Sequence, residues 1–150
     1  AKENGMEPIR ISQINYSLAH SSVETFGDNT LVCMDTKEFR WYKKHDFPVM
    51  AFSPQAKGFF AKLAKGDAAN NLPEGQYAGP ANLARLAKVK QLSEQTGDTP
   101  AKITLGYLNS QPFFVSSVFA VTKLWQLDED MEAQDLTYDP KTVAFLENMI

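Results

Sequence analysis

Three short apolar runs alternate with segments that carry helix signals, and this alternation constrains the fold more than any other feature of the sequence. Residues 9–14 alternate apolar and polar side chains with a period of two, as a β-strand does. Residues 49–52 form a short apolar run that begins after Pro48, and residues 113–121 form another after Pro112. Strands that are separated by helices pair in parallel, so the predicted fold class is α/β.

The segments between these strands carry helix start signals. Thr99 followed by Pro100 is an N-cap residue followed by proline at the first helical position, which is a specific helix start. Asp35 or Thr36 can cap an earlier helix with its side-chain oxygen. The sequence therefore predicts helices at residues 35–45, 59–63, 82–95, 99–111 and 123–134, and a last helix that starts at residues 139–140.

Two of these helices carry apolar residues at helical spacing, which is typical of a face that packs against a core. In residues 82–95 the stripe consists of Leu83, Leu86, Val89 and Leu92. In residues 123–134 it consists of Leu124, Leu127 and Met131.

Three other segments lack strong periodicity. Residues 15–35 are expected to form a long loop that contains a short helix at most, and residues 66–80 a mobile surface loop rich in turn residues. Residues 1–5 end in Gly5 and are typical of the last turn of a helix closed by glycine. We therefore expect the sequence to begin inside an element of a longer protein; a short disordered tag is the alternative.

The composition is that of an ordinary globular domain. The chain has 150 residues, of which 43% are hydrophobic, enough for a core. Its 15 Lys and Arg and 18 Asp and Glu residues give a net charge of −3, which leaves no positive excess for nucleic-acid phosphates. No apolar run approaches the about 18 residues that a membrane-spanning helix needs. These features predict no nucleic-acid or membrane partner, and we expect a cytoplasmic protein.

No spacing of residues predicts a metal site or an activated nucleophile. The single cysteine, Cys33, excludes a disulfide within the chain and a zinc site built on cysteines. His20 follows the first strand, where it either lines a substrate pocket or is solvated. His45 lies at a helix C-terminus, where its charge would complement the helix dipole.

Four segments carry motifs that occur together, in this order, in one enzyme family. Residues 12–18 contain Q-x-x-Y-S-L, and residues 48–60 contain a strand followed by S-P-x-x-x-G. Residues 97–108 contain G-x-T-P-A, and residues 114–127 place a strand before a T-x-x-x-Q-L helix start. Through these motifs, which span nearly its whole length, the chain resembles the aldo/keto reductases.

The resemblance implies a (β/α)8 barrel and an NADPH cofactor. The motifs are similar to those around the sixth, seventh and eighth strands of the family, so residues 1–150 would be a single partial domain, the C-terminal portion of the barrel. Three strands alone would also leave two unpaired sheet edges, which fits part of a larger sheet. In such barrels ligands bind at the C-terminal ends of the strands, and phosphate sites often follow strands seven and eight.

The resemblance assigns cofactor roles to residues at these strand ends. Gln13 would hydrogen-bond the nicotinamide carboxamide, and Phe52 would stack on the nicotinamide ring. Gly58 would let the backbone approach the pyrophosphate closely, and Lys123 would meet a 2′-phosphate. The implied cofactor set is Gln13, Phe52, Ser53, Gln55, Gly58, Ala120, Val121, Thr122, Lys123, Gln126 and Asp130.

The sequence also departs from the family pattern. The family usually has Tyr where Phe52 stands, Gly or Lys where Ala120 stands, and Asn where Asp130 stands; a carboxylate can accept hydrogen bonds but cannot donate them. The catalytic Asp, Tyr, Lys and His of the family come from the first half of the barrel and match no position here. We therefore assign no catalytic residue and expect the isolated 150-residue chain to be inactive.

Two hypotheses of function follow from the sequence. In the first, the chain is the C-terminal segment of an NADPH-dependent oxidoreductase that reduces a small carbonyl compound or oxidises an alcohol. In the second, it is a non-catalytic module that binds a missing N-terminal half-barrel or another copy of itself to close the sheet. An unrelated α/β domain with accidental motif matches is the third alternative.

Overall fold

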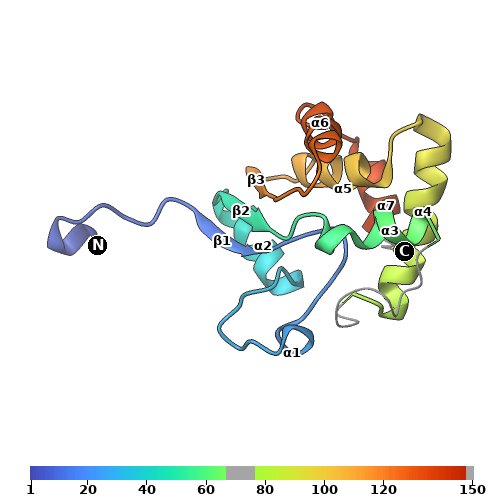
Figure 1. Ribbon diagram of the computed structural model, residues 1–150. Helices are drawn as coiled ribbons and strands as arrows, with labels where there is room; N and C mark the ends of the chain where they lie inside the picture. Colours follow the sequence, from blue (N-terminus) through green and yellow to red (C-terminus); the bar gives the residue numbers. More distant parts are fainter. Residues whose placement is uncertain (67–76, 148–150) are drawn as a thin grey trace.

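The computed structural model describes residues 1–66 and 77–147 (Figure 1). Its strands are β1 (Ser12–Asn15), β2 (Val49–Phe52) and β3 (Val115–Val118). Its α-helices are α1 (Val23–Phe26), α2 (Thr36–His45), α3 (Phe59–Ala64), α4 (Pro80–Thr96), α5 (Pro100–Asn109), α6 (Leu124–Glu132) and α7 (Pro140–Glu147), and two 3-10 turns are η1 (Lys2–Asn4) and η2 (Ala56–Gly58). The predicted helices are all present, with ends that differ by a few residues.

The three strands form one parallel sheet in the order β1-β2-β3. Val49 of β2 lies in register with Ser12 and Val115, and Phe52 lies in register with Asn15 and Val118. The α/β class and the parallel pairing predicted from the sequence are confirmed. The first and third strands are shorter than predicted: residues 9–11, 113–114 and 119–121 belong to no strand in the described part of the chain.

The two faces of the sheet differ in burial. On one face Val49 and Ala51 have no exposed surface, and Ile14 lies beside them on β1. On the other face Gln13 is exposed, and Met50 and Phe52 are only half-buried. Because side chains of a strand alternate between faces, Gln13, Met50 and Phe52 all belong to this second face. We call it the open face.

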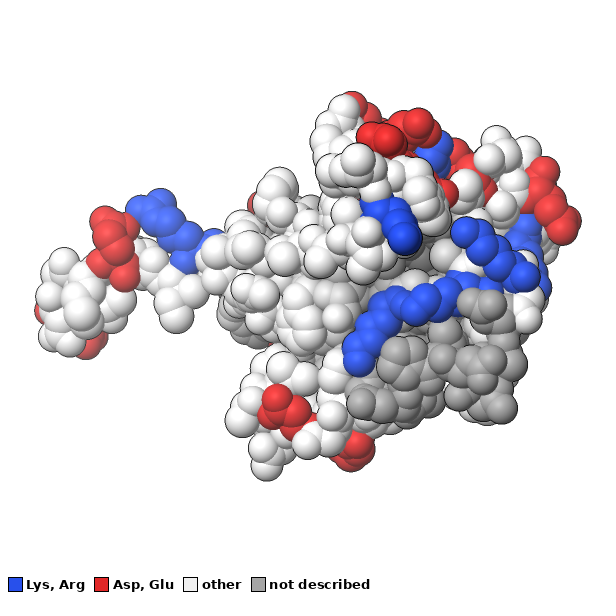
Figure 2. Space-filling view, viewed as in Figure 1, with Lys and Arg blue, Asp and Glu red and all other residues white. Residues whose placement is uncertain are grey.

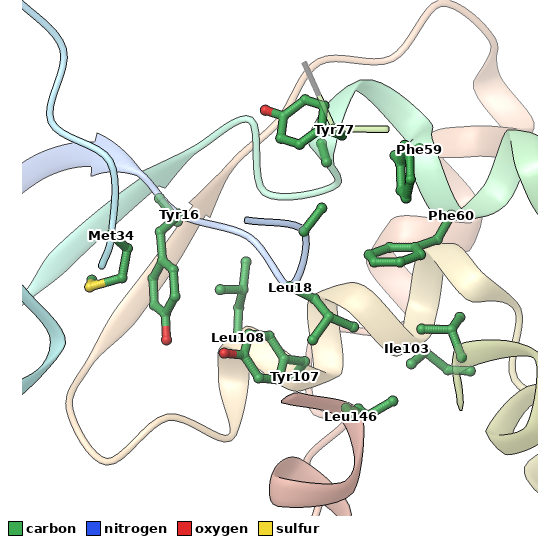
Figure 3. Close-up of a cluster of buried hydrophobic side chains, with 14 of the residues drawn as sticks. Tyr16, Leu18, Met34, Phe59, Phe60, Tyr77, Ile103, Tyr107, Leu108 and Leu146 are labelled. Atoms are coloured by element: carbon green, nitrogen blue, oxygen red, sulfur yellow. The ribbon is translucent and has the colours of Figure 1, made fainter. Parts of the chain in front are cut away.

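The core lies on the covered side and joins residues that are far apart in the sequence (Figure 3). Leu18, just after β1, contributes a side chain that is 1% exposed, and Phe59 and Phe60 of α3 are equally buried. The rings of Phe59 and Phe60 meet edge to face with their centroids 5.1 Å apart. The core is completed by Ile103, Tyr107 and Leu108 of α5 and by Leu146 of α7.

The apolar stripe predicted for α4 is only partly buried. Val89 and Leu92 are buried, but Leu83 is 43% exposed. Asn82 and Arg85, both polar, are buried on this helix instead. Each makes several hydrogen bonds, and a polar side chain whose bonds are satisfied can be buried without a large desolvation penalty.

The stripe predicted for α6 is exposed. Leu124 is 81% exposed, and Leu127 and Met131 are also exposed. Asp130 is the residue of this helix that is buried. The spacing identified one face of α6 correctly as apolar, but the predicted packing of that face against the core is wrong, because its side chains are exposed.

Asn82 connects the start of α4 to two other segments. Its Oδ1 accepts hydrogen bonds from the His20 amide (2.8 Å) and from the Arg85 guanidinium (3.2 Å). Its Nδ2 donates to the carbonyl oxygens of His20 (2.8 Å) and Tyr77 (2.9 Å). Arg85 also lies 3.2 Å from the ring of His20, and burial together with the Arg85 charge lowers the pKa of His20 to about 4. The backbone of His20 therefore ties the loop after β1 to Asn82 of α4, and its ring lies beside the buried guanidinium of Arg85.

The loop of residues 15–35 contains the short helix α1, as expected, and Ser22 caps it. Residues near its end turn back onto the outer edge of β1: the Asn15 amide donates to the Val32 carbonyl (2.9 Å), and the Met34 amide donates to the Asn15 carbonyl (2.8 Å). The predicted loop of residues 66–80 falls largely outside the described residues. At the other end, η1 is followed by Gly5 in a left-handed conformation (φ +66°), and residues 6–11 extend away from the body (Figure 1).

Gly106 is required by close packing of α5 against the segment that follows α6. A Cβ at this position would lie 2.9 Å from the Leu136 Cγ and 2.9 Å from the Tyr138 Cε2. Gly106→Ala is therefore expected to lower the free energy of unfolding by about 1–3 kcal/mol, although alanine favours helices. Urea denaturation is the measurement. Ala84→Gly, at an exposed site of α4, is the control, because it measures the effect of an alanine–glycine exchange on helix stability without any packing change. A Gly106→Ala protein that is more stable than the unaltered one would contradict the close packing described here.

Candidate functional site

The turn after β2 has an unusual backbone. Ser53, Ala56 and Lys57 have φ values of +53°, +50° and +57°, and Gly58 follows with +80°. Residues other than glycine adopt this region rarely, and such residues cluster at ligand-binding sites. Two hydrogen bonds hold the turn, from the Ala56 amide to the Ser53 carbonyl (2.8 Å) and from the Gly58 amide to the Gln55 carbonyl (2.9 Å).

A cavity of about 650 Å³ lies beside this turn. Its walls are α3, the C-terminal half of α4, the first turn of α5, and α6 with the segment before it. The cavity therefore lies beyond the C-terminal ends of β2 and β3, which is where parallel α/β folds bind ligands. Of the residues predicted to bind the cofactor, it is lined by Gln55, Gly58, Ala120, Val121, Gln126 and Asp130.

Two contacts connect opposite walls of the cavity. Gln55 Nε2 donates a hydrogen bond to Asp130 Oδ1 (2.6 Å), which joins the turn after β2 to α6. Burial raises the pKa of Asp130, and this hydrogen bond opposes that shift. The Lys65 ammonium lies 5.1 Å from the centre of the Trp125 ring, which joins the end of α3 to the same helix. The first contact holds α6 against the turn that follows β2, and the second holds it against the end of α3.

Gln126 shapes the cavity by capping α6. Its Oε1 accepts hydrogen bonds from the amides of Thr122 (3.1 Å) and Lys123 (3.0 Å). These bonds satisfy backbone donors at the helix start. The side-chain oxygen of Gln126 is therefore hydrogen-bonded within the protein, and its side-chain NH2 group is the part that can donate hydrogen bonds to a ligand.

Five predicted cofactor residues do not line the cavity. Gln13 and Phe52 lie on the open face of the sheet, at and below the C-terminal edge from which the turn starts. Ser53 lies in the strained turn itself. Thr122 and Lys123 lie in the exposed turn before α6. Their binding roles stay predictions.

Sequence reasoning missed part of the cavity wall. Lys62 of α3, Lys65 directly after that helix and Lys90 of α4 line it, as do Ser93 and Glu94. A signal for Lys62 and Lys65 was present in the sequence: they are three residues apart, which places them on the same side of a helical segment that begins after Gly58. Nothing in the sequence placed the C-terminal half of α4 at this site, because that position results from helix packing.

The remaining chemically active side chains have structural surroundings. The ring of His45 stacks on Trp41 at 4.4 Å, and its Nδ1 is hydrogen-bonded to the Trp41 carbonyl (2.8 Å). Cys33 is buried, and burial raises its pKa, so it is a weak nucleophile. Within the described residues there is no group of three side chains that could hold a metal ion. The described helices include none that is long and apolar enough to span a membrane.

Three solved structures with a similar fold are those of aldo-keto reductases. The thermostable aldo-keto reductase Tm1743, in complex with the inhibitor epalrestat, matches 95% of this chain with a TM-score of 0.62 and 15% identity. Two structures of aldo-keto reductase from Klebsiella pneumoniae match 92% and 91% of it with TM-scores of 0.58 and 0.55 and identities of 19% and 17%. Their structures are described as complexes with NADP and acetate and with NADPH.

This chain spans only part of those proteins. It covers 40%, 38% and 37% of the three structures, so its strands and helices correspond to a portion of the complete fold. The family model for the aldo/keto reductases matches residues 2–150. The chain therefore belongs to the aldo/keto reductase family, and its parallel strands and helices form part of the barrel of that family.

Proposed function

We propose that this chain forms the cofactor-binding part of a cytoplasmic, NADP-dependent oxidoreductase that interconverts small carbonyl compounds and alcohols. The cavity at the ends of β2 and β3 carries the proposal, because it brings Gln55 and Gly58 of one turn together with Ala120 and Asp130 of another segment. Membership of the family and the NADP complexes of two similar structures support the same class of ligand.

The residues present fit a dinucleotide. A volume of about 650 Å³ lies within the usual range of small-molecule sites, about 300–1,000 Å³. The turn of residues 53–58 would wrap the pyrophosphate, and Asp130 would accept a hydrogen bond from the adenine amino group with the oxygen that Gln55 leaves free. Gln13 and Phe52 would hold the nicotinamide at the open face of the sheet, one by hydrogen bonds and the other by stacking.

NADPH would supply the hydride, which passes between its nicotinamide ring and the carbonyl carbon of the substrate. This chain would orient the ring and form one wall of the substrate site. The proton donor would be a tyrosine of the rest of the barrel, acting as a general acid. The open face of the sheet is the surface that the rest of the barrel would cover, because Gln13 there is exposed and Met50 only half-buried.

The double variant Gln13→Ala/Phe52→Ala is expected to weaken NADPH binding at least about tenfold. It removes a hydrogen bond and an aromatic stacking contact, each contributing about 1 kcal/mol. The dissociation constant is measured by titration calorimetry on the protein that carries this chain. Leu83→Ala, at an exposed site on α4, is the control and should leave the constant unchanged. Equal affinity in the double variant and the unaltered protein would contradict the roles of both residues.

The same open face favours a second candidate function, a non-catalytic half-barrel that associates with another chain. The exposed stripe of α6, with Leu124 and Met131, adds apolar surface for such a contact. Sedimentation of the 150-residue chain distinguishes the two. A well-folded monomer would contradict the assembly module, and a stable dimer that binds no NADPH would favour it over the oxidoreductase.

A further inference from the structure

One side of α2 carries basic side chains that point away from the sheet. Lys37, Arg40 and Lys44 are three or four residues apart, so they lie on one side of the helix, and all are exposed. The opposite side is packed, since Tyr42 is buried and Phe39 packs against the core. The helix contains four Lys and Arg residues and one Glu, and no carboxylate of the described residues forms a salt bridge with any of these cations. We call Lys37, Arg40 and Lys44 the basic ridge.

Trp41 lies beside the basic ridge and is 46% exposed, although its ring is held in place. The ring stacks on that of His45 with the centroids 4.4 Å apart, and it meets the Phe47 ring edge to face at 5.6 Å. Tryptophan and arginine are enriched among the residues that carry most of the energy of protein–protein binding. A ring that is already fixed also loses little side-chain entropy on binding. A partner that fits this side of α2 therefore has carboxylates next to an exposed apolar side chain.

Helix α6 presents such a surface. It contains four Asp and Glu residues and no Lys or Arg, and Figure 2 shows acidic side chains gathered over it. Asp130 is buried, whereas Asp128 and Glu132, two residues before and after it, lie on the opposite side of the helix and are exposed. Met131 is 50% exposed beside them, and Glu132 also pairs with Lys102. We call Asp128, Met131 and Glu132 the acidic ridge.

The two ridges belong to different ends of the sheet. Helix α2 lies between β1 and β2 in the sequence, and α6 follows β3; β1 and β3 are the two outer strands of this sheet. In a (β/α)8 barrel the helices form the outer layer. The sides of α2 and α6 that point away from the strands are therefore expected to stay exposed when the rest of the barrel is present. One copy of the protein can use both ridges at once, each with a different neighbour.

We propose that copies of the protein associate head to tail, with the basic ridge and Trp41 of one copy packed against the acidic ridge of the next. Charge complementarity carries the choice of a second copy, and the thioether of Met131 is a favourable contact for the Trp41 ring. Because the two surfaces differ, the contact is heterologous. It goes beyond both functions proposed above, because it uses neither the open face nor the described lining of the cavity. A contact between two helices is small, so we expect a weak association with a Kd of about 0.1 mM.

The test measures the average mass of the protein that carries this chain by light scattering, at concentrations up to about 1 mM. Arg40→Glu and Asp128→Lys each reverse one charge at an exposed site, and each is expected to weaken self-association at least about tenfold. An equimolar mixture of the two variants should associate again, because the first keeps an intact acidic ridge and the second an intact basic ridge. Lys141→Glu, at an exposed site of α7, is the control and should associate like the unaltered protein.

Three results would overturn the proposal. An unaltered protein that stays monomeric over the whole concentration range would exclude the association. Association that both charge reversals leave unchanged would place the contact elsewhere on the molecule. A mixture of the two variants that stays monomeric would show that the basic ridge does not bind the acidic one and that its partner is another anionic surface. The NADPH affinity should be the same in both variants, since neither site lines the cavity; an unaltered protein that binds no NADPH would contradict the proposed function, whereas light scattering alone decides the association.

Discussion

Asn82→Leu is expected to lower the free energy of unfolding by about 3–5 kcal/mol. The substitution keeps the size of the side chain but removes the four hydrogen bonds of Asn82, to the amide and carbonyl of His20, the carbonyl of Tyr77 and the guanidinium of Arg85. The groups left without partners are largely buried, and an unsatisfied buried polar group costs about 1–3 kcal/mol. Urea denaturation measures the change.

Asn82→Asp is the matched variant. Aspartate keeps the acceptor for the His20 amide and gains an attraction to Arg85, but it cannot donate to the His20 and Tyr77 carbonyls. We expect a loss smaller than that of Asn82→Leu. A loss below about 1 kcal/mol for Asn82→Leu would contradict the view that this residue joins α4 to the loop after β1.

Phe60→Ala is expected to lower the free energy of unfolding by about 3–5 kcal/mol, the usual effect of removing a buried aromatic ring. Phe60 is 1% exposed, packs on Phe59 and also lines the cavity. The substitution should therefore weaken NADP+ binding as well, because α3 lines the cavity. Both effects are measured on the same protein, by denaturation and by titration calorimetry.

Leu124→Ala is the control for this prediction. Its side chain is 81% exposed, so the free energy of unfolding should change by less than about 0.5 kcal/mol. A large loss for Leu124→Ala would mean that the apolar face of α6 is covered in solution. A Phe60→Ala protein as stable as the unaltered one would contradict the core described for α3 and α5.

Much of the fold could be predicted from local sequence signals. Thr99 followed by Pro100 marks the start of α5, where the Thr99 hydroxyl accepts a hydrogen bond from the Lys102 amide. The Asp35 side chain likewise accepts from the Lys37 and Glu38 amides at the start of α2. Caps and prolines act within a few residues, so they can be recognised without tertiary structure.

Burial along α4 and α6 could not be predicted from apolar spacing. Arg85 is buried because His20 and the Glu147 carbonyl, which come from distant parts of the chain, meet its guanidinium together with Asn82 of the same helix. Asp130 is buried because Gln55 reaches it from the turn after β2. Both positions depend on contacts between segments that are distant in sequence, which a periodic pattern does not contain.

The candidate site, too, could be predicted from the sequence only in part. Gln55, Gly58 and Ala120 follow strand ends, so parallel pairing predicts that they meet. Lys90 and Ser93 belong to the C-terminal half of a 17-residue helix, and only the packing of that helix brings them to the cavity. The strand order therefore predicts one side of the site, and the helix arrangement supplies the other.

A crystal structure of the protein that carries this chain, with NADP+ bound, tests the central claim most directly. The account predicts that the adenosine part of the dinucleotide lies in the cavity between α3, α4 and α6, with the pyrophosphate at the turn of residues 53–58 and the adenine amino group near Asp130. The nicotinamide should lie beside Gln13 and Phe52. A dinucleotide bound with its adenosine outside this cavity would contradict the account.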